Sequence, residues 1–553
     1  MTSSRAIRAA LLVVASTLAC VTAFSSTSTA GAVPPSHHSN AEQKAADAAL
    51  RDVRAIFTRS PDAGARAALP DGGVEASMAL RDLALRADSL DPDDRAVAAA
   101  YLARPTDVKG DKVAGFVVKY DVAEAPPACS TDLCVHYVTT TANAPSLTDV
   151  TDSVGTAGAN GVPDYVDEVL RVMTAVHDTY VEAGYREPRG DGARGGGVDL
   201  IDVYLAEIGT AGLYGYCTTD QPNPTGGPAF YDRWANCVLD DDYAGFANTP
   251  QENIEVTAAH EYFHATQYAY DAFEDPWFLE ATATWAEDEV FDDVNDNVQY
   301  LRRSPLTAPF VPLDAFVGGG EYSGFHYGTW SFIRFLTEKY DDAQGTMPRL
   351  VLDMMEKVDG SLGAEDQYSW QAINSVLTAE RSSAAEEFLA YSVANRRPRE
   401  TYDEGEAQLY PTGPLRDSAT LSPRKRQVSF AATSTDHLTS ATYRLTPRKL
   451  TTSTTRLRLV LDLASTSSGS MAAVTLVTRQ GKAKVRTIAL DDDGDATKRV
   501  RFSSQQIKYV EVTLANTSAR FSDCYRFATP YSCGGSAPRD DDQRQQLSAR
   551  LTR

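Results

Sequence analysis

The sequence predicts an α+β fold with a helical N-terminal region and a C-terminal β-sandwich. Apolar residues recur at helical spacing between Asn40 and Thr106. Short strand-like segments and then further helical segments occupy the middle of the chain. Beyond about Arg426, Ser and Thr become abundant and apolar residues alternate with polar ones. Because a chain of 553 residues is too long for one ordinary core, we expect two or three structural units.

The N-terminus has the features of a signal peptide, which we place at residues 1–32. Arg5 and Arg8 precede an apolar stretch from Ala9 to about Phe24, and small residues follow. That stretch is too short to cross a bilayer, and no later run reaches the roughly 18 apolar residues that a membrane helix needs. We therefore expect a secreted protein without an integral membrane segment. The alternative is a lipoprotein attached at Cys20, whose surroundings match the attachment motif poorly.

Residues 33–125 are expected to form the helical N-terminal region. Leu80, Leu83 and Ala84 share one helix face, and Asp91 begins a helix, with a proline and acidic residues after it. Because this region follows the signal segment, it is either a propeptide or an N-terminal helical subdomain. It has no cysteine that could act as a metal-blocking switch.

Six cysteines remain after the signal segment, and an even number in an exported protein indicates disulfides. Short separations favour three local pairs among the fifteen possible pairings. These pairs are Cys129 with Cys134, Cys217 with Cys237, and Cys524 with Cys533. A structural zinc site is the weaker alternative, because no pair has Cys-x-x-Cys spacing and no histidine lies beside them at finger-like spacing.

The formal net charge of −23 is spread along the whole chain. Such a protein repels nucleic acid and anionic membranes, so neither is an expected partner. Solubility outside the cell explains the charge, and bound Ca²⁺ is a secondary explanation. Two acidic loops could hold calcium. One is Asn160–Glu168, and the other is Asp491–Asp495, for which a solvated hairpin turn is the alternative.

Residues 126–425 are expected to form one domain of strands and helices. Strands are predicted around Phe116–Tyr120, Val135–Thr139 and Val198–Leu205. After them, Tyr368–Asn395 has the apolar spacing of a helix. This order of strands and helices is that of an α+β domain.

Residues His260–His264 spell His-Glu-Tyr-Phe-His, an HExxH motif. Two histidines four residues apart on a helix leave the same face, so both imidazoles can bind one ion. Glu261, between them, can accept a proton from water without being a metal ligand. The motif therefore predicts a zinc hydrolase. The alternative is a core helix whose histidines are hydrogen-bonded to neighbouring residues.

A third ligand is expected, because catalytic zinc usually keeps three protein ligands and one water position. The pattern HExxHxxGxxH is absent, since positions 267 and 270 hold Gln267 and Tyr270. Glu280 begins a second predicted helix, in which the small Ala281 and Ala283 allow close approach to the first helix. The alternative role for Glu280 is that of a solvated or salt-bridged helix carboxylate.

The stretch around Glu280 resembles the gluzincin branch of the zincins, in which a ligand Glu lies in a Trp-hydrophobic-x-Glu-Gly-x-Ala block. The residues that match are Trp277, Phe278, Glu280 and Ala283. Ala281 replaces the usual glycine. The resemblance implies that His260, His264 and Glu280 are zinc ligands.

Gly324–Leu336 is similar to the helix that follows the ligand Glu in such peptidases. In that family a tyrosine or histidine near the start of this helix can donate a hydrogen bond to the tetrahedral oxyanion, which lowers the barrier. Tyr327 is the first candidate and His326 the second. The alternative for both residues is packing within an aromatic-rich helix.

Four sequence blocks together resemble an uncharacterised family of secreted bacterial metalloproteases. They are 160–167, 198–205, 214–217 together with 238–243, and the HExxH region. The resemblance covers roughly residues 129–399. It implies a zincin-like catalytic domain and protease activity, without indicating a substrate.

Residues 426–535 are expected to form the β-sandwich. Alternate residues of Leu457–Leu463 face one way, and Val510–Leu514 repeats this period of two. Residues 536–553 are polar and are expected to be a disordered tail.

These observations predict a secreted, monomeric zinc endopeptidase that acts on a protein or peptide substrate. Glu261 is the expected general base, and Tyr327 or His326 is expected to stabilise the oxyanion. An aminopeptidase is less favoured, because the chain lacks the Gly-x-Met-Glu-Asn segment with which aminopeptidases of this branch bind a substrate N-terminus. The alternative function is that of an inactive exported binding or adhesion protein, whose β-sandwich contacts polysaccharide or cell wall.

Overall fold

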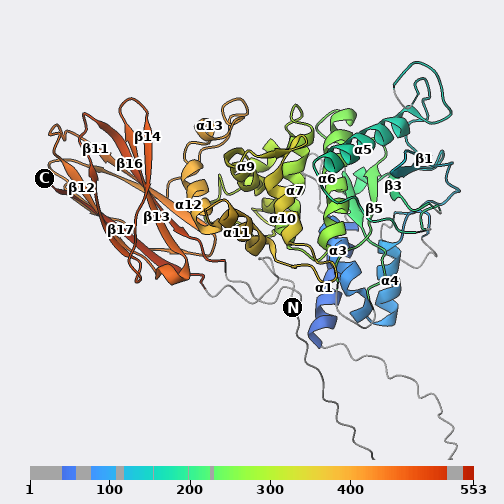
Figure 1. The fold of residues 1–553 in the computed structure, drawn as a ribbon, viewed down its shortest axis with the longest axis horizontal. Helices are drawn as coiled ribbons and strands as arrows, with labels where there is room; N and C mark the ends of the chain where they lie inside the picture. Colours follow the sequence, from blue (N-terminus) through green and yellow to red (C-terminus); the bar gives the residue numbers. More distant parts are fainter. Residues whose placement is uncertain are drawn as a thin grey trace, which may run out of the picture. The chain divides into compact units, whose positions relative to one another are not determined.

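The computed structural model describes residues 40–57, 76–107, 118–152, 155–192, 194–196, 198–224, 230–519 and 540–552 (Figure 1). The expected signal segment 1–32, with Cys20, lies outside these residues, as do Cys524 and Cys533. Within the described residues, no helix has both the length and the apolar character that crossing a bilayer requires.

A five-stranded sheet organises the first half of the chain. Its strands are β1 (Ala128–Cys129), β2 (Leu133–His136), β3 (Ile201–Ala206), β4 (Gly215–Thr218) and β5 (Asn236–Asp240). They lie in the order β1-β2-β3-β5-β4. Strands β2, β3 and β5 are parallel, whereas β4 runs antiparallel to β5 and forms one edge of the sheet. The strands expected at 135–139 and 198–205 correspond to β2 and β3.

The strand expected around Phe116–Tyr120 is absent from its described part, Val118–Tyr120. Tyr120 explains the difference, because its backbone amide donates to the Pro105 carbonyl, 2.8 Å away, and not to a neighbouring strand. Its hydroxyl donates to the Leu205 carbonyl at the end of β3, at 2.8 Å. The segment is therefore tied to the sheet by a side chain and not by strand pairing.

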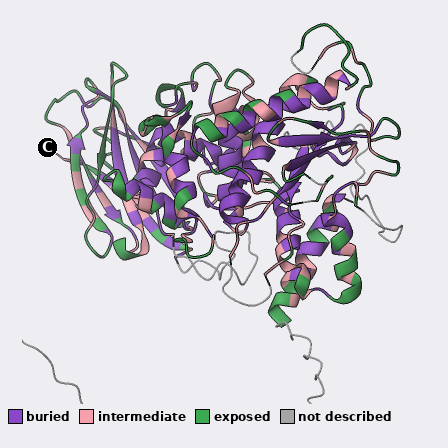
Figure 2. Cartoon of the chain, turned by 45° about the vertical axis from the view of Figure 1, so that its right-hand side comes forward, coloured by how far each residue is buried: buried purple, intermediate pink, exposed green. Residues whose placement is uncertain are grey.

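Alternate residues of the strands enter two different hydrophobic cores. Val203 and Leu205 of β3 pack in the core that includes α5 (Asp164–Glu182) and α6 (Pro250–Asp271). Tyr204, between them, packs in the core of the N-terminal helices. Because successive side chains of a strand point to opposite faces, helices cover both faces of this sheet. Figure 2 shows these strands as almost entirely buried.

The helices on the second face come from the N-terminal region. They are α1 (Asn40–Phe57), α3 (Ser77–Arg86) and α4 (Pro92–Leu102). Figure 1 shows them gathered beside the sheet. The fully buried Arg104, which follows α4, pairs with three aspartates: Asp191, Asp202 of β3, and Asp220. The helical character expected between residues 40 and 106 is confirmed for the described residues.

Two adjacent helices, α6 and α7 (Pro276–Val290), form the centre of the molecule's larger core. At the start of α6, Thr249 and Glu252 form a capping box. On α7, Ala281 and Ala283 have no exposed surface. Their small side chains allow the close approach of the two helices that the sequence predicts.

Further helices follow α7 in the chain. They are α8 (Phe325–Gly328), α9 (Trp330–Lys339), α10 (Arg349–Lys357), α11 (Ser369–Ala379), α12 (Ala384–Ala394) and α13 (Pro398–Thr401), with the short strands β6 (Ala343–Gln344) and β7 (Met347–Pro348). The helix expected over 368–395 is thus two helices. The break occurs because Arg381 has a φ of 64° and Ser383 caps α12, accepting from the Glu386 amide at 3.2 Å.

Two five-stranded sheets form the C-terminal part. Their strands are β8 (Asp417–Leu421), β9 (Gln427–Ser429), β10 (Thr433–Thr435), β11 (Thr439–Pro447), β12 (Arg456–Asp462), β13 (Ser470–Thr478), β14 (Ala483–Thr487), β15 (Asp495–Arg501), β16 (Ile507–Asn516) and β17 (Gln543–Thr552). One sheet has the order β14-β13-β16-β11-β8, and the other has β10-β17-β12-β15 with β9 beside β17. Apolar residues of both sheets share one core.

The expectation of a disordered polar tail at 536–553 is wrong for its described part, residues 540–552. Gln543–Thr552 forms β17, which pairs antiparallel with β12 and completes a sheet. Leu547 and Leu551 point into the shared core. The sequence hides this alternation because a polar residue, Gln545, also occupies a fully buried position on the strand.

Two of the three expected disulfides are confirmed. Cys129 bonds to Cys134 and Cys217 bonds to Cys237. In each case the two cysteines lie directly opposite each other on paired antiparallel strands. The third expected pair, Cys524 with Cys533, lies outside the described residues.

Candidate metal centre

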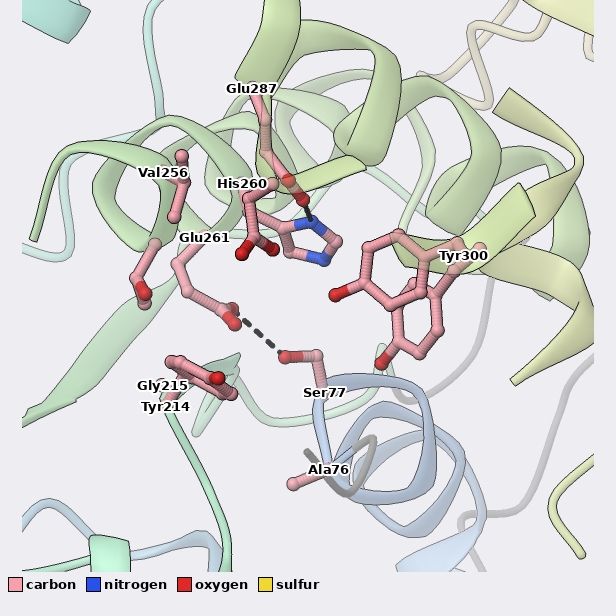
Figure 3. A pocket seen from close by; sticks show the side chains of 12 residues that line it. Ala76, Ser77, Tyr214, Gly215, Val256, His260, Glu261, Glu287 and Tyr300 are labelled. Atoms are coloured by element: carbon pink, nitrogen blue, oxygen red, sulfur yellow. Dashed lines mark hydrogen bonds and ion pairs between the residues drawn. The ribbon is translucent and has the colours of Figure 1, made fainter. Parts of the chain in front are cut away.

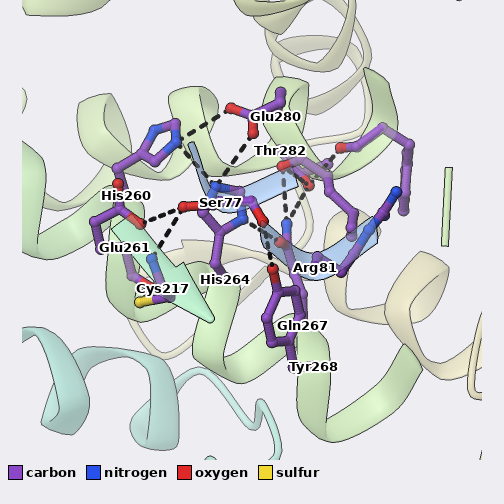
Figure 4. A network of polar contacts seen from close by, with 12 residues as sticks. Ser77, Arg81, Cys217, His260, Glu261, His264, Gln267, Tyr268, Glu280 and Thr282 are labelled. Atoms are coloured by element: carbon purple, nitrogen blue, oxygen red, sulfur yellow. Dashed lines mark hydrogen bonds and ion pairs between the residues drawn. The ribbon is translucent and has the colours of Figure 1, made fainter. Parts of the chain in front are cut away.

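Helices α6 and α7 bring the three predicted ligands together (Figure 4). His260 and His264 lie one helical turn apart, with their Nε2 atoms separated by 3.1 Å. On α7, Glu280 places Oε2 3.3 Å from His260 Nε2 and Oε1 3.5 Å from His264 Nε2. One ligand atom from each residue lies within 4.8 Å of the other two. A single ion with bonds of about 2 Å can occupy such a space.

The other nitrogen of each imidazole is held by a neighbouring side chain. His260 Nδ1 lies 2.6 Å from Glu287 Oε1, and His264 Nδ1 lies 2.8 Å from Gln267 Oε1. The Gln267 amide nitrogen donates to the Leu279 carbonyl at 2.9 Å, so its oxygen faces His264 as an acceptor. Both Nδ1 atoms therefore carry hydrogens, and both Nε2 atoms present lone pairs toward Glu280.

Glu280 is completely buried and lies between the two imidazoles. Neither of its carboxylate oxygens has a hydrogen-bond partner within the described part of the chain. Two imidazole lone pairs and a carboxylate thus converge where a cation is the complementary group. Two histidines and one glutamate are also a known ligand set of catalytic zinc, so these residues fit that ion.

Glu261 lies beside this cluster, at the wall of a pocket (Figure 3). The pocket contains about 510 Å³ of empty space, its open mouth included. Its walls include Ala76, Ser77, Tyr214, Gly215, His260, Glu261, Glu287, Tyr300 and Tyr327. Burial raises the pKa of Glu261, and the two histidines oppose that rise. A carboxylate with a raised pKa accepts protons more readily near neutral pH, as a general base must.

Tyr327 and His326 have different surroundings on α8. Tyr327 lines the pocket, and its ring centre lies 6.0 Å from that of His260. His326 is buried, stacks on Phe316 at 4.1 Å, and accepts through Nδ1 from the Val317 amide at 3.3 Å. Burial lowers the pKa of His326 to about 4. Of the two predicted oxyanion donors, only Tyr327 is among the residues that line the pocket.

Carboxylates in the two loops expected to bind calcium accept hydrogen bonds from backbone amides. In Asn160–Glu168, Asp164 accepts from the amide of Thr151 at 2.8 Å. In Asp491–Asp495, the Asp491 carboxylate accepts from the Asp495 amide at 2.8 Å. Calcium at either loop stays a prediction. Elsewhere in the described residues, three other groups could hold an ion: Asp132, His177 and Asp178; Asp240, Asp241 and Asp242; and Asp288, Asp292 and Glu404.

Three polar residues of this centre were not predicted from the sequence: Gln267, Glu287 and Ser77. The first two could have been found, because Gln267 lies three residues after His264 and Glu287 lies two turns after Glu280 on the same helix face. Ser77 donates a hydrogen bond to Glu261 Oε2 at 3.0 Å. No sequence pattern indicates a contact across 184 residues.

Comparisons with known proteins do not assign this chain to a family. No family model matches it, and no curated protein matches it. One similar solved structure is a family GH115 4-O-methyl-α-glucuronidase with specificity for decorated arabinogalactans, at 10% identity and a TM-score of 0.14. The match covers 55% of this chain and 32% of that one, so the chain spans about a third of its length. A TM-score this low says nothing about fold or activity.

Proposed function

We propose that the protein is a secreted zinc metallopeptidase with a zincin-like catalytic domain. The observation that carries this proposal is the convergence of His260, His264 and Glu280, with both imidazoles oriented by second partners and the buried Glu280 carboxylate between them. The general base expected of such an enzyme, Glu261, lies in the same pocket wall as His260. The two disulfides support an extracellular location.

Each residue of the site has one role in the proposed reaction. His260, His264 and Glu280 hold Zn²⁺, which supplies Lewis acidity that makes water nucleophilic at neutral pH. Glu261 accepts the proton of the attacking water and later returns it to the leaving amine. Tyr327 is the first candidate to donate a hydrogen bond to the oxyanion of the substrate, and His326 is the second.

The test compares wild-type protein with Glu261→Gln, using fluorescein-labelled casein as substrate. We expect the wild type to cleave casein and a chelator to stop it. Glu261→Gln should bind as much zinc as the wild type but cleave about 100- to 10,000-fold more slowly, the usual contribution of a general base. Cleavage by Glu261→Gln at the wild-type rate would refute the mechanism. A zinc-free wild type that binds cell-wall material and cleaves nothing would support the inactive binding protein instead.

A further inference from the structure

Ser77 joins the N-terminal region directly to the pocket (Figure 4). It is the first residue of α3. Its Oγ accepts a hydrogen bond from the backbone amide of Cys217, on the edge strand β4, at 3.0 Å. The same oxygen lies 3.0 Å from Glu261 Oε2. Because the amide approaches as a donor, the single hydroxyl hydrogen of Ser77 is directed to the carboxylate.

A fixed donor of this kind sets the orientation of a carboxylate. Glu261 has three rotatable side-chain torsions, and Ser77 restrains one of its two carboxylate oxygens. The other oxygen is then left to accept a proton from water. Both residues line the pocket next to His260, so the restraint acts where the proposed reaction takes place.

The helix that carries Ser77 is itself firmly held. The hydroxyl of Tyr268, on α6, donates to the Ser77 carbonyl at 3.4 Å. One turn later, the buried Arg81 donates to the Glu274 carbonyl at 2.6 Å. Met78 packs in the same core as α6 and α7. Ser77 therefore has a defined position relative to the base.

The rest of the N-terminal region is built into the domain in the same way. Its helices share a core with Tyr204, Tyr216 and Val238, which form the second face of the sheet. Arg104 compensates the charge of Asp202, which is completely buried on β3. Removal of these helices would expose an apolar sheet face and leave a buried aspartate without its cation.

From these contacts we infer that Ser77 is a positioning residue for Glu261, and that the N-terminal helical region remains part of the active enzyme. The inference rests on the proposed peptidase function. The sequence leaves two roles open for residues 33–125, a removed propeptide and a lasting subdomain. The inference favours the lasting subdomain.

The experiment measures kcat and KM of the full chain with Ser77→Ala, on fluorescein-labelled casein. We expect kcat to fall about 10- to 100-fold, because a reacting group displaced by about 1 Å can cost a factor of about 100. KM and zinc content should change little. Ser77→Thr, which keeps the hydroxyl, should recover most of the activity. The matched control is Ser503→Ala, which removes another buried serine hydroxyl, one that donates to the Leu450 carbonyl at 3.1 Å.

The opposite result would overturn the inference. If Ser77→Ala is as active as the wild type, Ser77 does not position the base. If it is more active, Ser77 holds the base in an unproductive position and the N-terminal region inhibits the enzyme. N-terminal sequencing of the secreted active protein gives a second test that does not depend on folding of the variant. An active chain that still contains residue 77 supports the inference, and one that starts after it refutes it. A wild type without zinc-dependent cleavage would instead refute the proposed function itself.

Discussion

His260 and His264 differ in the groups that hold their Nδ1 atoms. A buried carboxylate, Glu287, accepts from His260, whereas a neutral amide, Gln267, accepts from His264. A carboxylate behind an imidazole makes the ring a stronger metal ligand than an amide does. The two ligands are thus not equivalent.

Substitution of Glu287 tests this difference. Glu287→Gln keeps an oxygen acceptor for His260 but removes the negative charge. We expect zinc affinity to fall about 10- to 100-fold, the usual effect of losing such a partner. Competition with a fluorescent zinc chelator measures it, with Glu255→Gln as the control on α6, where the carboxylate accepts only from Gln251 among its described contacts. Equal zinc affinities of all three proteins would show that Glu287 does not affect zinc binding.

The relative positions of the site residues could be predicted from the sequence only for residues that lie close together in the chain. The four-residue spacing of His260 and His264 fixes their common direction in any helix, and Glu280 follows from the matching block on the next helix. The contact between Ser77 and Glu261 depends on how α3 packs against β4, which no local pattern specifies.

At the scale of elements, the N-terminal helices are attached to the sheet by a buried charge as well as by apolar packing. Arg104 has no exposed surface and contacts three aspartates, of which Asp191 and Asp202 are also buried. A buried pair contributes little net stability when both partners are present, but loss of one partner leaves the other charged and unpaired.

Arg104→Ala should therefore destabilise the protein by about 3 to 5 kcal/mol. The control is Arg54→Ala, which breaks the ion pair between Arg54 and Asp94. The side chains of these two residues are 40% and 43% exposed. Exposed pairs of this kind contribute about 0 to 1 kcal/mol. Chemical denaturation followed by circular dichroism measures both variants. Similar losses for the two would contradict the structural role of Arg104.

Strands proved harder to predict than helices because their signals are shorter. The helix start at Asp91 and Pro92 is correct: the Asp91 side chain makes no capping hydrogen bond, but a proline at the first helical position is a local signal. In β17, however, the first two inward positions are the buried Gln543 and Gln545, and apolar residues alternate only from Leu547 onward, so the strand resembles a polar tail. Pairing with β12, whose residues lie 84 to 96 positions before their partners, is what makes this segment a strand.

On the scale of the whole molecule, the C-terminal sheets are joined to the preceding helical part by buried ionic contacts. His437, between β10 and β11, lies 2.9 Å from Asp314 through Nε2 and 2.7 Å from Asp541 through Nδ1. Glu511 on β16 accepts from Arg396, which follows α12, at 3.0 Å. Both contacts connect segments that are more than 100 residues apart in the chain.

The His437 contact predicts a pH dependence of stability. Burial opposes the charge of His437, but Asp314 and Asp541 outweigh it and raise its pKa to about 9. This folded-state pKa lies above the usual value of 6.5. The contribution of protonated His437 to the stability of the fold is therefore complete below pH 6.5 and is lost as the pH rises to 9. It amounts to as much as about 3 kcal/mol. His437→Gln should lose much of the difference in thermal midpoint between pH 6 and pH 9.5. An unchanged difference would contradict the assignment.

The proposed function depends most on one zinc ion that is bound by three residues from two helices. Its most direct test is the zinc content of purified protein, measured by mass spectrometry for the wild type, His264→Ala and Glu280→Ala. We predict one zinc per wild-type chain and a large loss in both variants, each of which lacks one of the three ligands. A wild type that takes up no zinc when zinc is supplied, or variants that retain it fully, would contradict the claim.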